Sequence, residues 1–384
     1  MRALFGKAAS VWAAALLALA LACTVCAGSA FATTLKDSDY PAVENISSST
    51  IVGADLSYCN VQQEWGKTFS DFSGNTQQTA LPALKEAGFN TVSVKVAVNP
   101  TGDNARFSLE NGIATLKAAK AAGFTTNLVL MYSDEYTYRG WQPVPSAWAD
   151  ETDMTAKAVS YTGEVMDALA KEGLSVDILT IGHDIGWEFL GYKDSDSWKI
   201  WPALAQVTKA ARDKDANLKI AIGVTAGNDD DDPTGIRWIM DKLNEDWLVT
   251  DYGFSYDYIA ATVSYDGIDA DYIASMRDEF TTKEEVAGKA AQLFVADVSF
   301  DRASEKVNTE DKLQDQADGI YGFLKASVSA KNAGGMVYDS ADIVGSGSWG
   351  LASLFDEYGT PVDSIRVVGL AQGQEVSTIT RDPY

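Results

Sequence analysis

The chain has 384 residues, of which 30 are basic and 54 are acidic, so its formal net charge at pH 7 is −24. A protein this acidic should repel nucleic acids and anionic lipid surfaces, and it suits a neutral polymer better than a polyanionic one. With only three cysteines, of which two lie before residue 30, the chain is not a disulfide-rich scaffold and depends on a large core.

The first 32 residues have the pattern of a secretory signal peptide. Arg2 and Lys7 precede an apolar run over residues 11–22, and small residues follow up to Ala32. This pattern predicts cleavage near Ala32 and release from the cell, because the apolar run is too short to cross a membrane. Without its two basic residues the mature chain carries a net charge of −26, and it retains a single cysteine, Cys59.

Hydrophobic patterns along the mature chain predict strands that alternate with helices. The predicted strands cover residues 50–56, 91–98, 125–132, 176–181, 218–223, 259–265, 293–297 and 335–338. The predicted helices cover residues 79–87, 113–122, 154–172, 201–212, 236–243, 270–279 and 313–330. This alternation favours a single α/β domain, a (β/α)8 TIM barrel, over residues 50–370, with an N-terminal extension at 33–49 and a C-terminal tail at 371–384.

Two of the predicted strands lead directly into an acid. The run VDILTIGHD ends at Asp184, and the run LFVAD ends at Asp297. In a barrel of parallel strands the carboxyl ends share one face, where catalysis usually takes place. We therefore predict that Asp184 and Asp297 are a catalytic pair that faces a common cavity.

Metal and cofactor signatures are missing from the sequence. It has no zinc-ligand spacing and no phosphate-binding loop, so we expect no cofactor and no metal. The acidic run NDDDD at 228–232 lacks the D-x-D-x-D-G spacing of a calcium loop. We interpret it as a solvated loop, with calcium binding as the alternative.

Six stretches of the chain carry a family resemblance. They are GADLSYCNVQQEWGKTFSDFSGN, LKEAGFNTVSVKVAVNP, MYSDEYTYRGWQPVPSAW, TIGHDIG, FVADVSF and GSGSWGLASLFDEYGTPVDSI, in this order between about residues 51 and 368. Together they resemble glycoside hydrolase family 53, the secreted endo-β-1,4-galactanases that act on arabinogalactan. The resemblance implies a galactan-like polysaccharide as partner, an acid/base at Asp184 and a nucleophile at Asp297.

The chain departs from the family pattern at the positions that matter for catalysis. Both catalytic glutamates of the family are aspartates here. Further departures are found at His183, Ser93, Lys95, Ala97, Met131, Tyr136, Tyr138, Asp339 and Ser340. A retaining pair needs carboxyl groups about 5–5.5 Å apart, and two shortened side chains would widen the gap to about 7–8 Å, where a water fits and inversion becomes possible. Loss of the family's arginines, with lysine at position 95, argues against efficient retaining catalysis.

Candidate residues for sugar binding come partly from the resemblance and partly from aromatic character. They are His183, Asp55, Lys95, Tyr132, Trp187, Tyr265 and Trp349. The aromatic members are almost as often packing residues.

Three functions stay open. The first is a secreted galactan hydrolase that cleaves O-glycosidic bonds with an aspartate pair. The second is an inactive galactanase-like barrel that binds extracellular polysaccharide, and the third is an adhesion scaffold. The family resemblance does not choose among them, because a fold does not transfer its function. None of them involves nucleic acid or a membrane, and the oligomeric state is not predicted.

Overall fold

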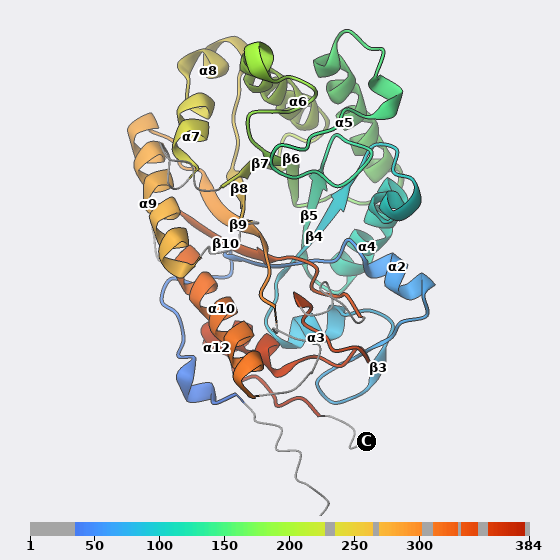
Figure 1. Cartoon of the computed structure of the whole chain (residues 1–384), viewed down its shortest axis with the longest axis vertical. Helices are drawn as coiled ribbons and strands as arrows, with labels where there is room; N and C mark the ends of the chain where they lie inside the picture. Colours follow the sequence, from blue (N-terminus) through green and yellow to red (C-terminus); the bar gives the residue numbers. More distant parts are fainter. Residues whose placement is uncertain are drawn as a thin grey trace, which may run out of the picture. The chain divides into compact units, whose positions relative to one another are not determined.

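The computed structural model describes residues 35–226, 235–263, 269–301, 310–328, 332–344 and 352–380. Within these residues eight parallel strands close into a barrel in the order β1-β10-β9-β8-β7-β6-β5-β4, which confirms the predicted (β/α)8 fold. Figure 1 shows the helices arranged around these strands. The barrel strands are β1 (Ile51–Asp55), β4 (Thr91–Val96), β5 (Thr125–Leu130), β6 (Ile178–Ile185), β7 (Lys219–Thr225), β8 (Tyr258–Thr262), β9 (Gln292–Val298) and β10 (Ala333–Tyr338).

The helices that cover the barrel alternate with its strands along the chain. The α-helices are α2 (Cys59–Glu64), α3 (Leu81–Glu86), α4 (Leu109–Ala121), α5 (Met154–Lys171), α6 (Ile200–Lys214), α7 (Arg237–Leu243), α8 (Asp246–Tyr252), α9 (Ala270–Ala287), α10 (Glu310–Val328) and α12 (Val367–Ala371). Short elements complete the fold, namely the hairpin of β2 (Phe69–Ser70) and β3 (Thr76–Gln77) and the 3₁₀ turns η1 (Asp37–Asp39), η2 (Gly102–Phe107), η3 (Ser146–Trp148), η4 (Asp194–Lys199) and η5 (Asp363–Arg366). None of the described helices combines the length and the apolar composition that a membrane crossing requires.

Local sequence explains where several of these helices begin. The side chains of Ser108, Asp153 and Asp269 accept hydrogen bonds from the first turns of α4, α5 and α9, which is the usual N-cap arrangement. Helix α2 lies between the predicted strand at 50–56 and the predicted helix at 79–87, where the sequence patterns indicate no helix. It has only six residues, too few to show a clear helical period in the sequence.

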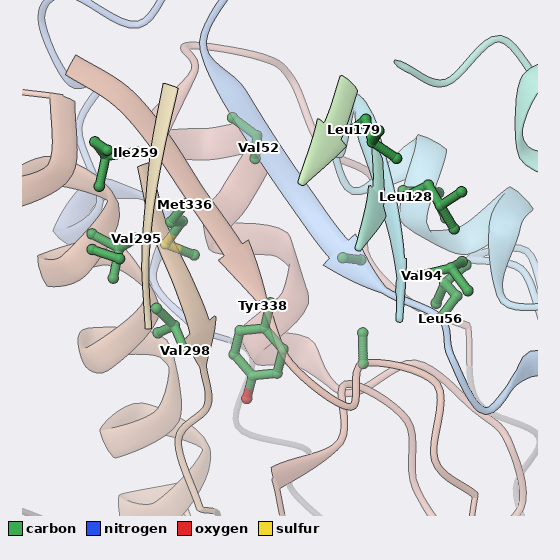
Figure 2. Close-up of a cluster of buried hydrophobic side chains, with 14 of the residues drawn as sticks. Val52, Leu56, Val94, Leu128, Leu179, Ile259, Val295, Val298, Met336 and Tyr338 are labelled. Atoms are coloured by element: carbon green, nitrogen blue, oxygen red, sulfur yellow. The ribbon is translucent and has the colours of Figure 1, made fainter. Parts of the chain in front are cut away.

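Alternate residues of the strands point outward and form the main core beneath the helices. Figure 2 shows Val52, Val94 and Leu128 among the buried side chains of this layer. The residues between them point into the barrel. There a smaller apolar cluster fills the part that lies on the amino-terminal side of the polar groups. This inner cluster comprises Ile51, Ile178, Ala221, Ala260, Phe294 and Val337. The polar groups described below are the next inward-facing residues toward the carboxyl ends of the strands.

The segments that flank the barrel in sequence also pack against it. Leu35 and Tyr40 are buried in the main core. The buried guanidinium of Arg366 binds Asp37, at 2.8 Å, and the carbonyl oxygen of Ser377. The described parts of the predicted N-terminal extension and C-terminal tail therefore belong to the same packed unit, whereas the predicted signal peptide lies outside the described residues.

Gly163 within helix α5 and Gly173, two residues after its end, provide a test of the backbone geometry. A Cβ at Gly163 would meet only the Lys214 side chain, at 3.8 Å, so Gly163→Ala should raise the free energy of unfolding by about 0.4–1 kcal/mol. Gly173 has a φ of +67°, so Gly173→Ala should lower it by about 1–2 kcal/mol although the space is open. Urea denaturation of both variants measures the difference, and two changes of the same sign would contradict it.

Candidate active site

Both predicted catalytic acids lie in irregular ends of their strands. Strand β6 pairs with β7 at Ile181 and again at Ile185, with a register shift between the two points, and Asp184 within this bulge has a φ of 53°. Strand β9 has a similar shift against β10, where Asp297 has a φ of 57°. Aspartate tolerates this left-handed conformation better than most residues do. Such bulges redirect side chains near active sites.

A glycine on the neighbouring strand makes room for the β6 bulge. A Cβ at Gly223 would lie 2.2 Å from the carbonyl oxygen of Gly182, a distance that no side chain can accept. Gly182 itself has a φ of 75°. The conformation of the segment that carries His183 and Asp184 therefore depends on glycines at both positions.

Asp297 is held by two cationic side chains and a phenol. Its Oδ1 lies 2.9 Å from Lys95 Nζ, and its Oδ2 lies 2.5 Å from His183 Nε2. The hydroxyl of Tyr136 donates a hydrogen bond to the same Oδ2, at 3.2 Å. Both oxygens of this buried carboxylate are thus engaged by other protein groups.

Lys95 is the centre of a larger ion cluster. Besides Asp297, its Nζ contacts Asp55 Oδ2 at 3.2 Å and Asp339 Oδ1 at 2.8 Å. The Lys95 side chain is almost completely buried, and so is Asp55. One ammonium group therefore contacts three carboxylates, which come from β1, from β9 and from the residue after β10.

The contacts of His183 favour its protonated form. Its Nδ1 lies 2.9 Å from the carbonyl oxygen of Thr137, which can only accept a hydrogen bond, so Nδ1 carries a proton. Its Nε2 faces the carboxylate of Asp297, which accepts as well. Both contacts therefore favour the imidazolium form of His183. Burial, which lowers the pKa of His183, is outweighed by the charge and hydrogen bond of Asp297, which raise it.

The same charges set the pKa values of the neighbouring groups. Burial would raise the pKa of Asp297, but Lys95 and His183 hold it well below its usual range. Burial would lower the pKa of Lys95, but its three carboxylates raise it well above normal. For Asp55, burial outweighs the charge of Lys95 and raises the pKa.

Asp184 has a different environment from Asp297. Its side chain is buried, with the residue 1% exposed, and Oδ2 accepts a hydrogen bond from the backbone N–H of Arg139 at 2.7 Å. Burial raises its pKa, and the positive charge of His183 offsets this only in part. Asp184 therefore keeps its proton to a higher pH than an ordinary aspartate does, whereas Asp297 loses its proton at a lower pH.

The loop between β5 and α5 is fastened over the end of β6. Gln142 Nε2 donates to the carbonyl oxygens of His183 and Asp184, at 3.0 and 3.2 Å. Thr137 is bound to both the ring and the carbonyl oxygen of His183. These contacts fix the loop that carries Tyr136 against the ion cluster.

Two small cavities border the cluster. One of about 20 Å³ lies beneath it, among Ser93, Asn127 and Thr180, and has room for about one water molecule. The other, of about 140 Å³, lies beside Lys95 and is lined by Asp55, Tyr58, Arg106, Tyr136 and Asp339 among others. Ligand pockets in proteins usually measure about 300–1,000 Å³, so neither cavity is large enough for an oligosaccharide.

The structure brings together four of the predicted site residues, Asp55, Lys95, His183 and Asp297. Trp187 is exposed at the rim of the barrel. Tyr132 is buried in the core, where its hydroxyl bonds the Thr162 hydroxyl at 2.8 Å. The Tyr132 ring therefore packs inside the protein instead of presenting a face to a sugar, contrary to the role suggested for it. Tyr265 and Trp349 lie outside the described residues.

Several residues of the site were not among the predicted ones. Asp339 directly follows β10, and Asp297 is the next-to-last residue of β9. The position of Asp339 after a predicted strand was therefore a usable signal. Tyr136, Thr137, Arg139 and Gln142 belong to a long loop, and no local pattern indicates which of its side chains turn toward β6.

No group of three or more histidine, cysteine, aspartate or glutamate side chains in the described part of the chain is arranged to hold a metal ion. At the ion cluster the three carboxylates surround an ammonium group instead. The acidic run at 228–232 lies outside the described residues.

The chain is similar to one family of proteins over most of its length. A family model described as Glycosyl hydrolase family 53 matches residues 51–367. The probable arabinogalactan endo-β-1,4-galactanase A of Neosartorya fischeri is 33% identical over 135 residues, which cover 35% of this chain and 37% of that protein. The endo-β-1,4-galactanase of Bacillus subtilis is 27% identical over 191 residues, or 48% of this chain and 44% of that protein. The chain thus matches less than half the length of these two relatives.

A solved structure agrees over a longer range. The Ignisphaera aggregans GH53 catalytic domain superposes with a TM-score of 0.73 at 22% identity, covering 86% of this chain and 99% of that one. At this identity the likeness shows the fold.

Proposed function

The chain belongs to glycosyl hydrolase family 53, and from that premise we propose that it binds a β-1,4-galactan-type polysaccharide without efficient hydrolysis. We propose further that it is secreted after cleavage near Ala32. The polysaccharide would lie across the carboxyl ends of the barrel strands, above the ion cluster.

The observation that carries this proposal is the engagement of Asp297. A retaining nucleophile must direct one carboxylate oxygen at the sugar carbon. Here Oδ1 is bound by Lys95, and Oδ2 by His183 and Tyr136. A sugar carbon that approaches Asp297 competes with these three contacts, and breaking a buried ion pair costs about 3–5 kcal/mol.

The ligand class follows from the relatives and from the charge. Two curated proteins similar to this chain are named as endo-β-1,4-galactanases. The polymer in that name, β-1,4-galactan, consists of uncharged galactose units. A net charge of −24 disfavours polyanionic chains. A neutral galactan satisfies both observations.

A second candidate function is slow hydrolysis by Asp184 and Asp297. The observation in its favour is the opposite direction of their pKa shifts, since a glycosidase needs one protonated and one ionised carboxyl group. In this function Asp184 would protonate the leaving oxygen, and Asp297 would attack the sugar or activate a water.

One experiment separates the two functions. The purified mature chain is run through a gel containing β-1,4-galactan and is also incubated with the same polymer while reducing ends are measured. We expect retarded migration, and no release of reducing ends beyond that of the Asp184→Asn and Asp297→Asn variants. The endo-β-1,4-galactanase of Bacillus subtilis serves as the positive control for hydrolysis.

Reducing ends released by the native chain and lost in both asparagine variants would establish hydrolysis instead, and the anomer of the product would then distinguish retention from inversion. Unretarded migration together with no release would reject both galactan functions and leave the adhesion scaffold.

A further inference from the structure

We propose that the exposed residues Tyr138, Trp141 and Trp187, together with the partly buried Trp238 of α7, form the surface on which the sugar chain lies, and we call these four residues the aromatic strip. The proposal rests on the proposed function and adds the place of binding. In this proposal the sugar chain is recognised at the surface of the protein and not at the buried acids Asp184 and Asp297.

The first pair is Trp187 and Trp238. Their rings are parallel, with centroids 3.7 Å apart and 4° between planes. Trp238 also packs edge-on against the buried ring of Trp201. Trp187 nevertheless remains 55% exposed. Stacking on Trp238 therefore holds the Trp187 ring in place, while more than half of the residue stays in contact with solvent. Packing in the core does not explain this exposure.

The second pair is Tyr138 and Trp141. Their rings lie 6.3 Å apart at 17°, and they are 50% and 45% exposed. Two backbone hydrogen bonds join the same residues, from Tyr138 N to Trp141 O at 3.1 Å and from Trp141 N to Tyr138 O at 2.8 Å. This tight turn fixes both rings at the surface.

Three residues of the strip, Tyr138, Trp141 and Trp187, lie close in sequence to residues at the end of β6, and Trp238 of α7 stacks on Trp187. Arg139, between Tyr138 and Trp141 in sequence, donates its backbone N–H to Asp184, and Gln142 is bound to the carbonyl oxygens of His183 and Asp184. Trp187 follows Asp184 by three residues. The strip is therefore positioned by the β6 bulge although it does not include the acids.

The chemistry of the strip suits a neutral pyranose chain. Aromatic faces carry partial negative charge and attract the C–H faces of sugar rings, which also bury apolar area there. The large negative charge of the chain adds repulsion for acidic sugars. We therefore assign the strip to uncharged hexopyranose polymers, with β-1,4-galactan as the one to test.

The test compares Trp187→Ala with Trp198→Ala in the full mature chain. Trp198 in η4 is similarly exposed, at 60%, and its ring lies beside the Lys199 ammonium group, outside the strip. Loss of one stacking ring should weaken galactan binding about tenfold in Trp187→Ala and leave it unchanged in Trp198→Ala. Trp187→Phe should recover much of the affinity, and polygalacturonate, the charged control polymer, should not bind. Thermal unfolding of each variant checks that the fold is kept.

The outcomes separate this inference from the proposed function. Native binding to galactan that Trp187→Ala and the double variant Tyr138→Ala/Trp141→Ala leave unchanged would reject the strip and keep the proposed function. Absence of native binding to galactan would reject the proposed function. The strip would then be supported only by Trp187-dependent binding to mannan or β-glucan, which are also uncharged hexopyranose polymers, and binding to neither would reject it as well.

Discussion

Replacement of Lys95 with methionine is expected to lower the free energy of unfolding by about 3–5 kcal/mol at pH 7. The variant keeps the volume of the side chain but leaves Asp55, Asp297 and Asp339 without the ammonium group that lies within 3.2 Å of each. Removal of one partner from a buried ion cluster costs more than loss of the attraction alone, because the remaining charges stay out of water.

The pH dependence of this loss is part of the prediction. The pKa of Asp297 is held far below normal in the native chain, so its stabilising contribution is present above its unfolded pKa of about 3.9 and is lost only as the pH falls through the lower folded value. In Lys95→Met the carboxylates take up protons at higher pH, which relieves their repulsion. The stability gap between the two proteins should therefore narrow as the pH falls from 7 toward 4.

Urea denaturation at several pH values measures the gap. Lys117→Met is the matched control, because Lys117 pairs with Glu172 at the surface, where both side chains are about half exposed. Such a pair contributes about 0–1 kcal/mol. Equal losses in the two variants would show that Lys95 does not hold a buried cluster together.

The second large effect is expected at His183, the only histidine of the chain. His183→Gln should lose about 1.5–3 kcal/mol at pH 6, since it replaces a charged hydrogen bond to Asp297 with a neutral one. The folded pKa of His183 is raised, so its contribution is complete below the unfolded pKa of about 6.5 and disappears as the pH rises through the folded value. The difference in free energy of unfolding between the native chain and His183→Gln should therefore be largest below about pH 6.5 and should disappear as the pH rises through the folded pKa of His183.

A single histidine makes this titration directly measurable by NMR. The imidazole signals of the native chain should titrate above pH 6.5, and in Asp297→Asn they should titrate at lower pH, because the neutral amide no longer stabilises the imidazolium. A native midpoint at or below 6.5 would mean that His183 and Asp297 do not form the ion pair, and that His183 does not hold Asp297 Oδ2 away from a sugar.

Periodicity was enough to predict the barrel. The strands are apolar runs bounded by polar or glycine positions, and their alternation with helices has few architectural solutions. The placement of Asp184 and Asp297 at strand ends followed from the same pattern, because parallel strands bring their carboxyl ends to one face. The short helix α2 and the caps of several helices were less visible, since six residues or a single side chain give little periodic signal.

The sequence by itself therefore determined the eight-stranded barrel, its acidic character and the face that carries the site, because these depend on patterns repeated over the whole chain. Only the tertiary structure decided that Lys95 contacts three carboxylates, that His183 binds Asp297, and that Asp184 accepts a hydrogen bond from the backbone N–H of Arg139. The physical reason is that these contacts join residues 40 to 244 positions apart through two strand bulges and one long loop, whose directions no local pattern specifies.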